Sequence, residues 1–310
     1  MFGGYRFFLA ALVALSHFGV QIAGFNPGQW AVISFYTLSG LLMERQFQKL
    51  SRNGSGKSGF YLDRFLRIYP LYFFVLLLAW LGNPLSWGVL ANFALLPLNY
   101  NDFIGVPILI GPAWSLACEV HFYLLVPLLA SCPTKMLRVV LLSSLSLFTL
   151  SPFLPHSTFL GCASLPGILF TFTTGMLINR KDFAFIKIVY AVMALLLAAF
   201  ALTKIFHAGL PTGIHINVAI GYLIAVVAIS FLDRFSPKIK WDVFLGLFSY
   251  PLFLCHGIVA RFVGAHFSVS NPLGLLSSSI IFAAVLILIV EIPFDRIRYK
   301  VRKEISAEAK

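Results

Sequence analysis

The chain has 310 residues, of which 59% are hydrophobic and 11% charged, and its mean hydropathy is +0.90. No soluble domain of this size buries enough surface for that balance, so these values exclude a soluble enzyme and predict a polytopic membrane protein. Long apolar runs between charged hinges are typical of membrane-spanning helices, whereas a barrel shows short alternating strands. The expected fold is therefore an all-α transmembrane bundle.

The four cysteines and the net charge of +12 narrow the choice of function. Cys118, Cys132, Cys162 and Cys255 lie in or next to apolar runs without close pairing, which argues against a metal site and against a disulfide framework. Membrane proteins concentrate lysine and arginine on their cytoplasmic side for topological reasons. We therefore expect no nucleic-acid partner.

Apolar runs long enough to cross a membrane predict about ten helices. They fall near 6–24, 29–47, 66–83, 113–131, 136–152, 158–178, 184–204, 214–232, 243–264 and 273–292. With both termini in the cytoplasm, 21 of the 23 lysines and arginines lie on the cytoplasmic side, as the positive-inside rule requires. We expect an integral membrane domain over 1–295 and a short basic cytoplasmic tail over 296–310.

Two of the predicted connections are longer than helix packing requires. Residues 45–65 form a basic segment that contains glycine and serine, and we expect a cytoplasmic loop there. Residues 84–112 carry four prolines but no lysine or arginine, and they fall on the external side. Their apolar content predicts a re-entrant or surface-lying segment.

The first apolar segment begins with Arg6 and carries His17. On an α-helix the two side chains return to nearly the same face and lie about 16 Å apart along the axis. If Arg6 marks the membrane edge, His17 lies near the middle of a hydrocarbon core about 30 Å thick. An ionisable side chain there is costly and indicates a functional site. Position alone leaves a second interpretation open, a histidine that hydrogen-bonds between packed helices.

Arg64 and Arg67 lie three residues apart, so they share a helical face at the predicted cytoplasmic end of their span. Paired guanidinium groups suit phosphate, because each offers a planar fork of donors. They also fit the role of ordinary positive-inside anchors, and charge alone does not exclude that interpretation.

Ser115, Glu119 and Tyr123 recur every four residues and line one face of the predicted span 113–131. Glu119 is the only acidic residue deep inside a predicted span. A carboxylate at that depth requires a partner or loses its charge, so it is rarely structural. This face is therefore a second candidate for function.

Counting about 1.5 Å per residue from the predicted helix ends places four polar side chains at similar depths near the midplane. They are His17, Ser39, Glu119 and His256, and each belongs to a different predicted helix. Independent structural histidines would have no reason to share a level. The shared depth favours one functional site.

Five short motifs follow one another along the chain. They are Arg6 and His17 with ten residues between them, Phe35-Tyr-Thr-Leu-Ser39-Gly40, Arg64-Phe-Leu-Arg67-Ile, Trp114-Ser115-Leu-x-x-Glu119-x-x-Phe122-Tyr123, and Ser249-Tyr250 leading to His256. In this order they resemble the acyltransferase-3 family of membrane O-acyltransferases, which modify O-antigens, peptidoglycan, exopolysaccharides and nodulation factors in bacteria. The resemblance continues to Glu291-Ile-Pro293 near the end of the last predicted span.

The resemblance implies a multi-pass enzyme of the bacterial cytoplasmic (inner) membrane. Its implied donor is acyl-CoA in the cytoplasm, most often acetyl-CoA, and it holds no permanently bound cofactor. The implied acceptor is a hydroxyl of a cell-surface or lipid-linked glycan, such as O-antigen or exopolysaccharide, at the outer face among the membrane lipids.

The resemblance and the residue chemistry together suggest roles. Arg6, Arg64 and Arg67 are expected to hold the phosphates of the donor. His17 is expected to act as general base, with Glu119 orienting its imidazole or stabilising its charged form. The candidates for binding the oxyanion or the sugar are Ser39, Ser115, Tyr123, Ser249 and His256.

Two other functions fit part of the pattern. A proton-coupled secondary transporter would use Glu119 and the histidines as a proton relay. Transporters often have paired halves, however, and we find no second copy of these motifs. A structural scaffold would leave the midplane carboxylate and the ordered motifs unexplained.

Overall fold

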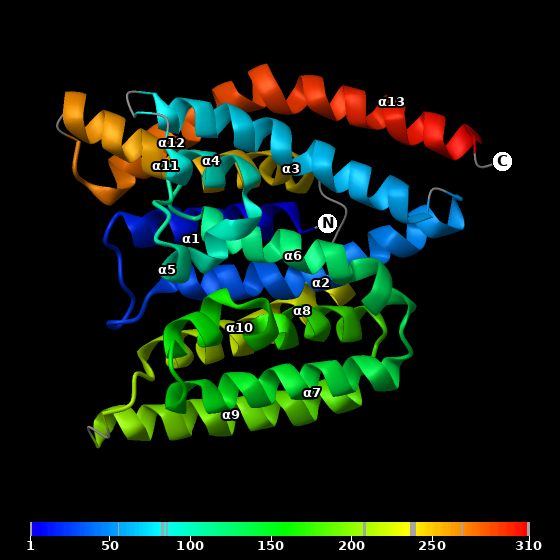
Figure 1. Cartoon of the computed structure of the whole chain (residues 1–310), viewed down its shortest axis with the longest axis vertical. Coiled ribbons are helices and arrows are strands. Elements are labelled where there is room, and N and C mark those ends of the chain that lie inside the picture. Colours follow the sequence, from blue (N-terminus) through cyan, green and yellow to red (C-terminus); the bar gives the residue numbers. More distant parts are fainter. Residues whose placement is uncertain are drawn as a thin grey trace. The chain divides into compact units, whose positions relative to one another are not determined.

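The structure is a computed structural model that describes residues 2–54, 56–81, 84, 86–206, 209–235, 240–267 and 269–308 (Figure 1). Within these ranges all helices are joined by turns and irregular segments, without a strand, so the all-α prediction is confirmed for them. The chain divides into two compact units. Unit 1 comprises Met1–Ile22, Gln46–Ala117 and Pro237–Lys310, and unit 2 comprises Ala23–Arg45 and Cys118–Ser236.

Unit 1 consists mainly of long helices from the two ends of the chain. They are α1 (Gly3–His17), α3 (Gly56–Trp80), α11 (Lys240–Phe267), α12 (Pro272–Leu286) and α13 (Ile292–Glu308), and the π-helical turn η4 (Ile287–Glu291) joins the last two. The expected external segment forms three short helices, α4 (Trp87–Ala94), η1 (Leu96–Tyr100) and α5 (Asn101–Ile104).

Unit 2 takes its helices from the middle of the chain. They are α7 (Thr134–Leu150), η2 (Ser151–Phe153), η3 (Phe159–Ala163), α8 (Leu165–Asn179), α9 (Phe183–Ile205) and α10 (Gly213–Phe235). Two helices contribute residues to both units, α2 (Pro27–Arg52) and α6 (Ala113–Ser131).

Seven helical segments of the described chain are long and apolar enough to cross a membrane, and they coincide with the last seven predicted spans. The multi-pass character is therefore supported. The first three predicted spans also form helices, but α1 has 15 residues, and α2 and α3 carry charged residues at one end. The number of about ten spans and the cytoplasmic location of both termini stay predictions.

The first predicted span is wrong at its C-terminal end, because α1 stops at His17 and does not reach residue 24. Gly19 adopts the left-handed conformation (φ +88°). Its N–H bonds to the Ser16 carbonyl at 3.2 Å, and the Val20 N–H bonds to the Leu15 carbonyl at 3.0 Å. This pair of bonds is a Schellman motif, which closes a helix. His17 is therefore the last residue of α1 and not an interior position.

The predicted loop over 45–65 is also wrong, since α2 continues to Arg52 and α3 begins at Gly56. Lysine, arginine and glutamine are good helix formers, so the charged segment extends the helix. Gly54, with φ +80°, lies in the short turn that remains. The segment expected as a basic tail is helical as well, because α13 continues from η4 to Glu308.

Three contacts set the order of helices in unit 1. α1 runs parallel to α11, since Gly3 meets Asp242 and His17 meets His256. α12 is antiparallel to α11, and α13 lies along α3 (Figure 1). In unit 2, the Gly40 and Gly175 positions let α2 and α8 approach closely, because a Cβ on Gly40 would lie 1.8 Å from the Phe172 carbonyl oxygen.

Candidate active site

Small residues and a capping carboxylate fix the register between α1 and α11. A Cβ on Gly3 would lie 1.6 Å from the Asp242 carbonyl oxygen, so this position has no room for a side chain. The Gly4 N–H donates a 3.0 Å hydrogen bond to Asp242 Oδ1, which satisfies an N–H of the first turn of α1. The carboxylate also lies at the positive end of the α1 dipole. The two helices are thus held together where they begin.

Arg6 lies against α11 in the next turn. Its carbonyl oxygen accepts a 3.0 Å hydrogen bond from Ser249 Oγ, and its Nη2 lies 3.1 Å from the position of a Cβ on Gly246. Gly246 therefore leaves the room that the Arg6 side chain occupies. A serine hydroxyl has one donor hydrogen, and Ser249 uses it for this helix contact. The predicted role of Ser249 towards the substrate stays a prediction.

His17 and His256 meet farther along the same helix pair. His17 Nδ1 lies 2.8 Å from His256 Nε2, and the two rings differ in plane by 13°. His256 is buried, with 1% of its surface exposed, whereas His17 is exposed at the end of α1. The Phe18 ring packs edge-on against His256. The structure thus joins two of the predicted site residues directly, one accessible and one enclosed.

A second hydrogen bond anchors His256 within its own helix. His256 Nδ1 lies 3.1 Å from the carbonyl oxygen of Leu252, four residues earlier. Both ring nitrogens of His256 therefore have a partner, one in α11 and one in α1. The ring cannot rotate without losing both bonds, so it holds a fixed orientation towards His17.

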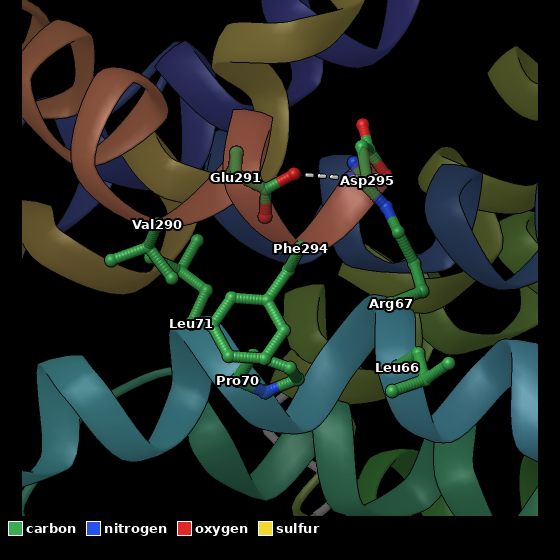
Figure 2. Close-up of a pocket in the computed structure, with 8 residues that line it drawn as sticks. All are labelled: Leu66, Arg67, Pro70, Leu71, Val290, Glu291, Phe294 and Asp295. Atoms are coloured by element: carbon green, nitrogen blue, oxygen red, sulfur yellow. Dashed lines mark hydrogen bonds and ion pairs between the residues drawn. The ribbon is translucent and has the colours of Figure 1, made fainter. Parts of the chain in front are cut away.

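Arg67 pairs with carboxylates of the last helical segment. It forms an ion pair with Glu291 of η4, and its Nη1 lies 3.9 Å from Asp295 Oδ1. Figure 2 shows both acids turned towards the Arg67 guanidinium across a small pocket between α3 and the η4–α13 segment. The pocket is lined by Leu66, Arg67, Pro70, Leu71, Val290, Glu291, Phe294 and Asp295.

Arg64 also forms an ion pair with a carboxylate. It pairs with the buried carboxylate of Asp63, which also accepts from Gln46 and from Arg298 Nε at 3.1 Å. The two arginines expected to hold phosphate are therefore already engaged with carboxylates in this structure. The sequence does not predict Glu291 and Asp295 as partners of Arg67, or Arg298 as a partner of Asp63. No residue spacing indicates ion pairs between α3 and the η4–α13 segment.

The other predicted site residues fall in two places. Ser115, in unit 1, is buried and donates to the Pro112 carbonyl at 2.8 Å. In unit 2 the Tyr123 hydroxyl donates to Glu119 Oε1 at 2.6 Å, one helical turn apart on α6 as predicted. Ser39 is buried, and its hydroxyl makes no hydrogen bond with the described residues. The proposed orientation of His17 by Glu119 stays a prediction.

Comparison with known proteins agrees with the motifs. The acyltransferase-3 family model, described as an acyltransferase domain, matches residues 4–292. A protein of Aquifex aeolicus (strain VF5), described as uncharacterized, is 24% identical over 209 residues, which cover 63% of this chain and 91% of the relative. No solved structure matches the chain. Because the family match covers nearly the whole chain, including His17 and His256, the protein belongs to the acyltransferase-3 family.

Proposed function

We propose that this membrane acyltransferase transfers an acyl group, which we expect to be acetyl, from cytoplasmic acyl-CoA to a glycan hydroxyl at the outer face of a bacterial cytoplasmic membrane. The family match and the membrane-spanning helices support the general reaction. The observation that carries the mechanism is the exposed imidazole of His17 at the end of α1, which is hydrogen-bonded to the buried His256.

In the proposed reaction His17 acts as general base. The acceptor hydroxyl lies about 3 Å from the free imidazole nitrogen, which takes its proton as the oxygen attacks the thioester carbonyl. A new C–O bond forms, the tetrahedral oxyanion collapses, and the C–S bond breaks. Coenzyme A leaves as a thiolate that is protonated from solvent or from the histidinium. No redox partner or metal ion is needed for this sequence.

Coenzyme A carries several phosphate charges, so its binding requires cationic donors. We propose that Arg6, Arg64 and Arg67 supply them. A guanidinium has five N–H donors, so Arg67 retains capacity after it pairs with Glu291. Glu291 and Asp295 then act as competitors that the phosphates displace or share. Displacing these carboxylates lowers the affinity for the donor, so we expect acyl-CoA to bind with moderate affinity.

Ser39 is the best candidate among the other polar residues for contact with the oxyanion or the sugar. Buried hydroxyl groups almost always find a hydrogen-bond partner, and that of Ser39 has none among the described residues. A hydroxyl without a partner is available to a substrate oxygen. Ser115 and Tyr123 stay proposed contacts of the oxyanion or the sugar, and Glu119 stays the proposed partner that orients His17 or stabilises its charged form. The hydroxyl hydrogens of Ser115 and Tyr123 are engaged in this structure, so they would have to exchange partners.

The test is donor consumption by the purified full-length chain in lipid vesicles. Acetyl-CoA labelled in its acetyl group is added with membranes of a bacterial strain that lacks the gene, which provide the glycan acceptor. We expect release of coenzyme A together with label in the glycan. If neither acetyl-CoA nor succinyl-CoA is consumed, and protons or solutes move across the vesicle membrane instead, the transporter interpretation replaces ours.

A further inference from the structure

We infer that His256 is a positioning residue that sets the tautomer of His17, so that Nε2 of this exposed histidine is the atom that accepts the proton. The inference rests on the proposed function and deepens it. From the sequence His256 was a candidate for holding the oxyanion or the sugar. Its two hydrogen bonds, 2.8 Å to His17 and 3.1 Å to the Leu252 carbonyl, indicate a different task.

The Leu252 carbonyl determines which nitrogen of His256 carries the hydrogen. A carbonyl oxygen only accepts hydrogen bonds, so the hydrogen in the 3.1 Å contact belongs to His256 Nδ1. A neutral imidazole carries one N–H, and its other nitrogen is an acceptor. In neutral His256 that acceptor is Nε2, the atom that faces His17.

His256 in turn determines which nitrogen of His17 carries the hydrogen. Because His256 Nε2 accepts, the hydrogen in the 2.8 Å contact belongs to His17 Nδ1. The remaining nitrogen of neutral His17, Nε2, therefore carries a lone pair. The structure gives it no hydrogen bond with the described residues. A backbone carbonyl in α11 thus determines, through two rings, which nitrogen of an exposed histidine is basic.

The same hydrogen bond also favours the charged state of His17. When His17 Nε2 takes the acceptor proton, the ring becomes a cation whose Nδ1–H still donates to His256. Hydrogen bonds from charged donors are shorter and about twice as strong as neutral ones, so the pair stabilises the intermediate more than the resting enzyme. Neutral His256 does this without a buried negative charge. In a serine protease the same two tasks, tautomer and charge, fall to a carboxylate.

Exposure separates the two histidines further. His256 is 1% exposed and lies under the edge of Phe18, so its own nitrogens do not reach a substrate. His17 is exposed and forms the last residue of α1, before the Schellman turn at Gly19. The chain therefore offers one nitrogen of the pair, His17 Nε2, to an incoming hydroxyl.

A spectroscopic test reads the tautomer without activity. The full-length protein is labelled with ¹⁵N-histidine in lipid discs, and the His17 signal is assigned by its loss in His17→Ala. We expect a protonated Nδ1 and a bare Nε2 in the wild type, and a shift towards the Nε2–H form in His256→Leu. A wild-type His17 protonated on Nε2 overturns the inference.

A kinetic test uses two replacements of His256. Glutamine can place a carbonyl oxygen where His256 Nε2 lies and accept from His17, whereas leucine cannot. We expect His256→Leu to lose roughly 10- to 100-fold in kcat, less than the ~10⁴ that accompanies loss of a charged orienting partner. The KM values of His256→Leu for donor and acceptor should equal those of the wild type. His256→Gln should recover part of the lost kcat. Equal kcat in His256→Leu and the wild type contradicts the inference.

A matched control isolates the pair from general effects of removing a histidine. His266 makes the same bond to a carbonyl four residues earlier, with Nδ1 2.9 Å from Phe262 oxygen, but contacts no second histidine through a hydrogen bond among the described residues. His266→Leu should leave kcat unchanged. Loss of transfer in His17→Ala with a fully active His256→Leu leaves the proposed function intact and rejects only the inference. An active His17→Ala rejects the proposed general-base role of His17 and the inference with it.

Discussion

His17 of unit 1 and His215 of unit 2 are both hydrogen-bonded histidines, yet their surroundings are opposite. His215 Nε2 lies 2.6 Å from Ser151 Oγ, and both side chains are 0% exposed. The rings of Phe148 and Phe200 pack on His215 with centroids 5.2 and 5.5 Å away. His17 has its hydrogen-bond partner on one side and is exposed on the other.

The comparison shows why a serine–histidine contact is not by itself a catalytic pair. Gly161 packs so closely that a Cβ there would lie 2.6 Å from His215 Nε2, so no substrate reaches that ring. The hydroxyl of Ser151 also donates to the Phe148 carbonyl at 2.8 Å, which ties it to the end of α7. The His215 contact therefore stabilises unit 2, while the His17–His256 pair leaves a basic nitrogen accessible.

The largest effect is expected when both members of the unit 1 pair are removed. A positioning residue has no function without the base it positions, so His17→Ala combined with His256→Leu should be no slower than His17→Ala alone, about 10²- to 10⁴-fold below the wild type. The measurement is a double-mutant cycle, in which initial rates of label transfer in vesicles are compared for the wild type, the two single variants and the double variant. Independent roles for the two rings would multiply their separate losses.

His215→Leu should act on stability and not on chemistry. The substitution leaves Ser151 Oγ buried without its imidazole partner, which we expect to lower the free energy of unfolding by about 1–3 kcal/mol. Thermal unfolding in detergent measures the loss, and kcat per folded molecule should equal that of the wild type. A loss of kcat at full folding would place His215 in the catalytic machinery and remove the contrast between the units.

Gly3→Ala tests the close approach of α1 and α11 on which the unit 1 pair depends. The new methyl group would lie 1.6 Å from the Asp242 carbonyl oxygen, so the helices must separate, at a cost of about 1–3 kcal/mol. Gly4→Ala is the matched control, because its nearest neighbour is 3.6 Å away. Unfolding curves should shift for Gly3→Ala and stay near wild type for Gly4→Ala. Equal curves would show that the helices do not meet at Gly3.

The smallest effect concerns Arg67. Removing the charge of its carboxylate partner in Glu291→Gln frees the guanidinium for phosphate, so we expect KM for acyl-CoA to fall by roughly two- to fivefold, a change below about 1 kcal/mol. Arg67→Ala should raise it. Steady-state kinetics with varied donor measure both. A KM for the donor that does not change in Arg67→Ala refutes the phosphate role.

Contacts between candidate site residues that are close in sequence could be predicted from local spacing. Arg6 and His17 do share α1, and Glu119 and Tyr123 do meet across one turn, because helical periodicity depends on neighbours along the chain. Gly19, two residues after His17, is a sequence signal for the end of α1. The apolar run that continues to residue 24 favours a longer helix, and the prediction followed that run.

Contacts between distant segments could not be derived from one sequence. His17 and His256 are 239 positions apart, and Arg67 and Glu291 are 224 apart. The apolar composition indicates that histidines and arginines in these segments need polar partners. The packing of α1 on α11 and of α3 on α13 determines which residues those partners are. For the same reason the sequence assigned the orienting role to Glu119 and did not identify His256 as the direct neighbour of the base.

The most direct measurement compares acyl transfer by the wild type, His17→Ala and His266→Ala at matched expression in membranes, with saturating labelled acyl-CoA. If His17 accepts the proton of the acceptor hydroxyl, His17→Ala loses about 10²- to 10⁴-fold in rate while His266→Ala transfers label like the wild type. Transfer by His17→Ala at the wild-type rate would contradict the mechanism proposed for this family member.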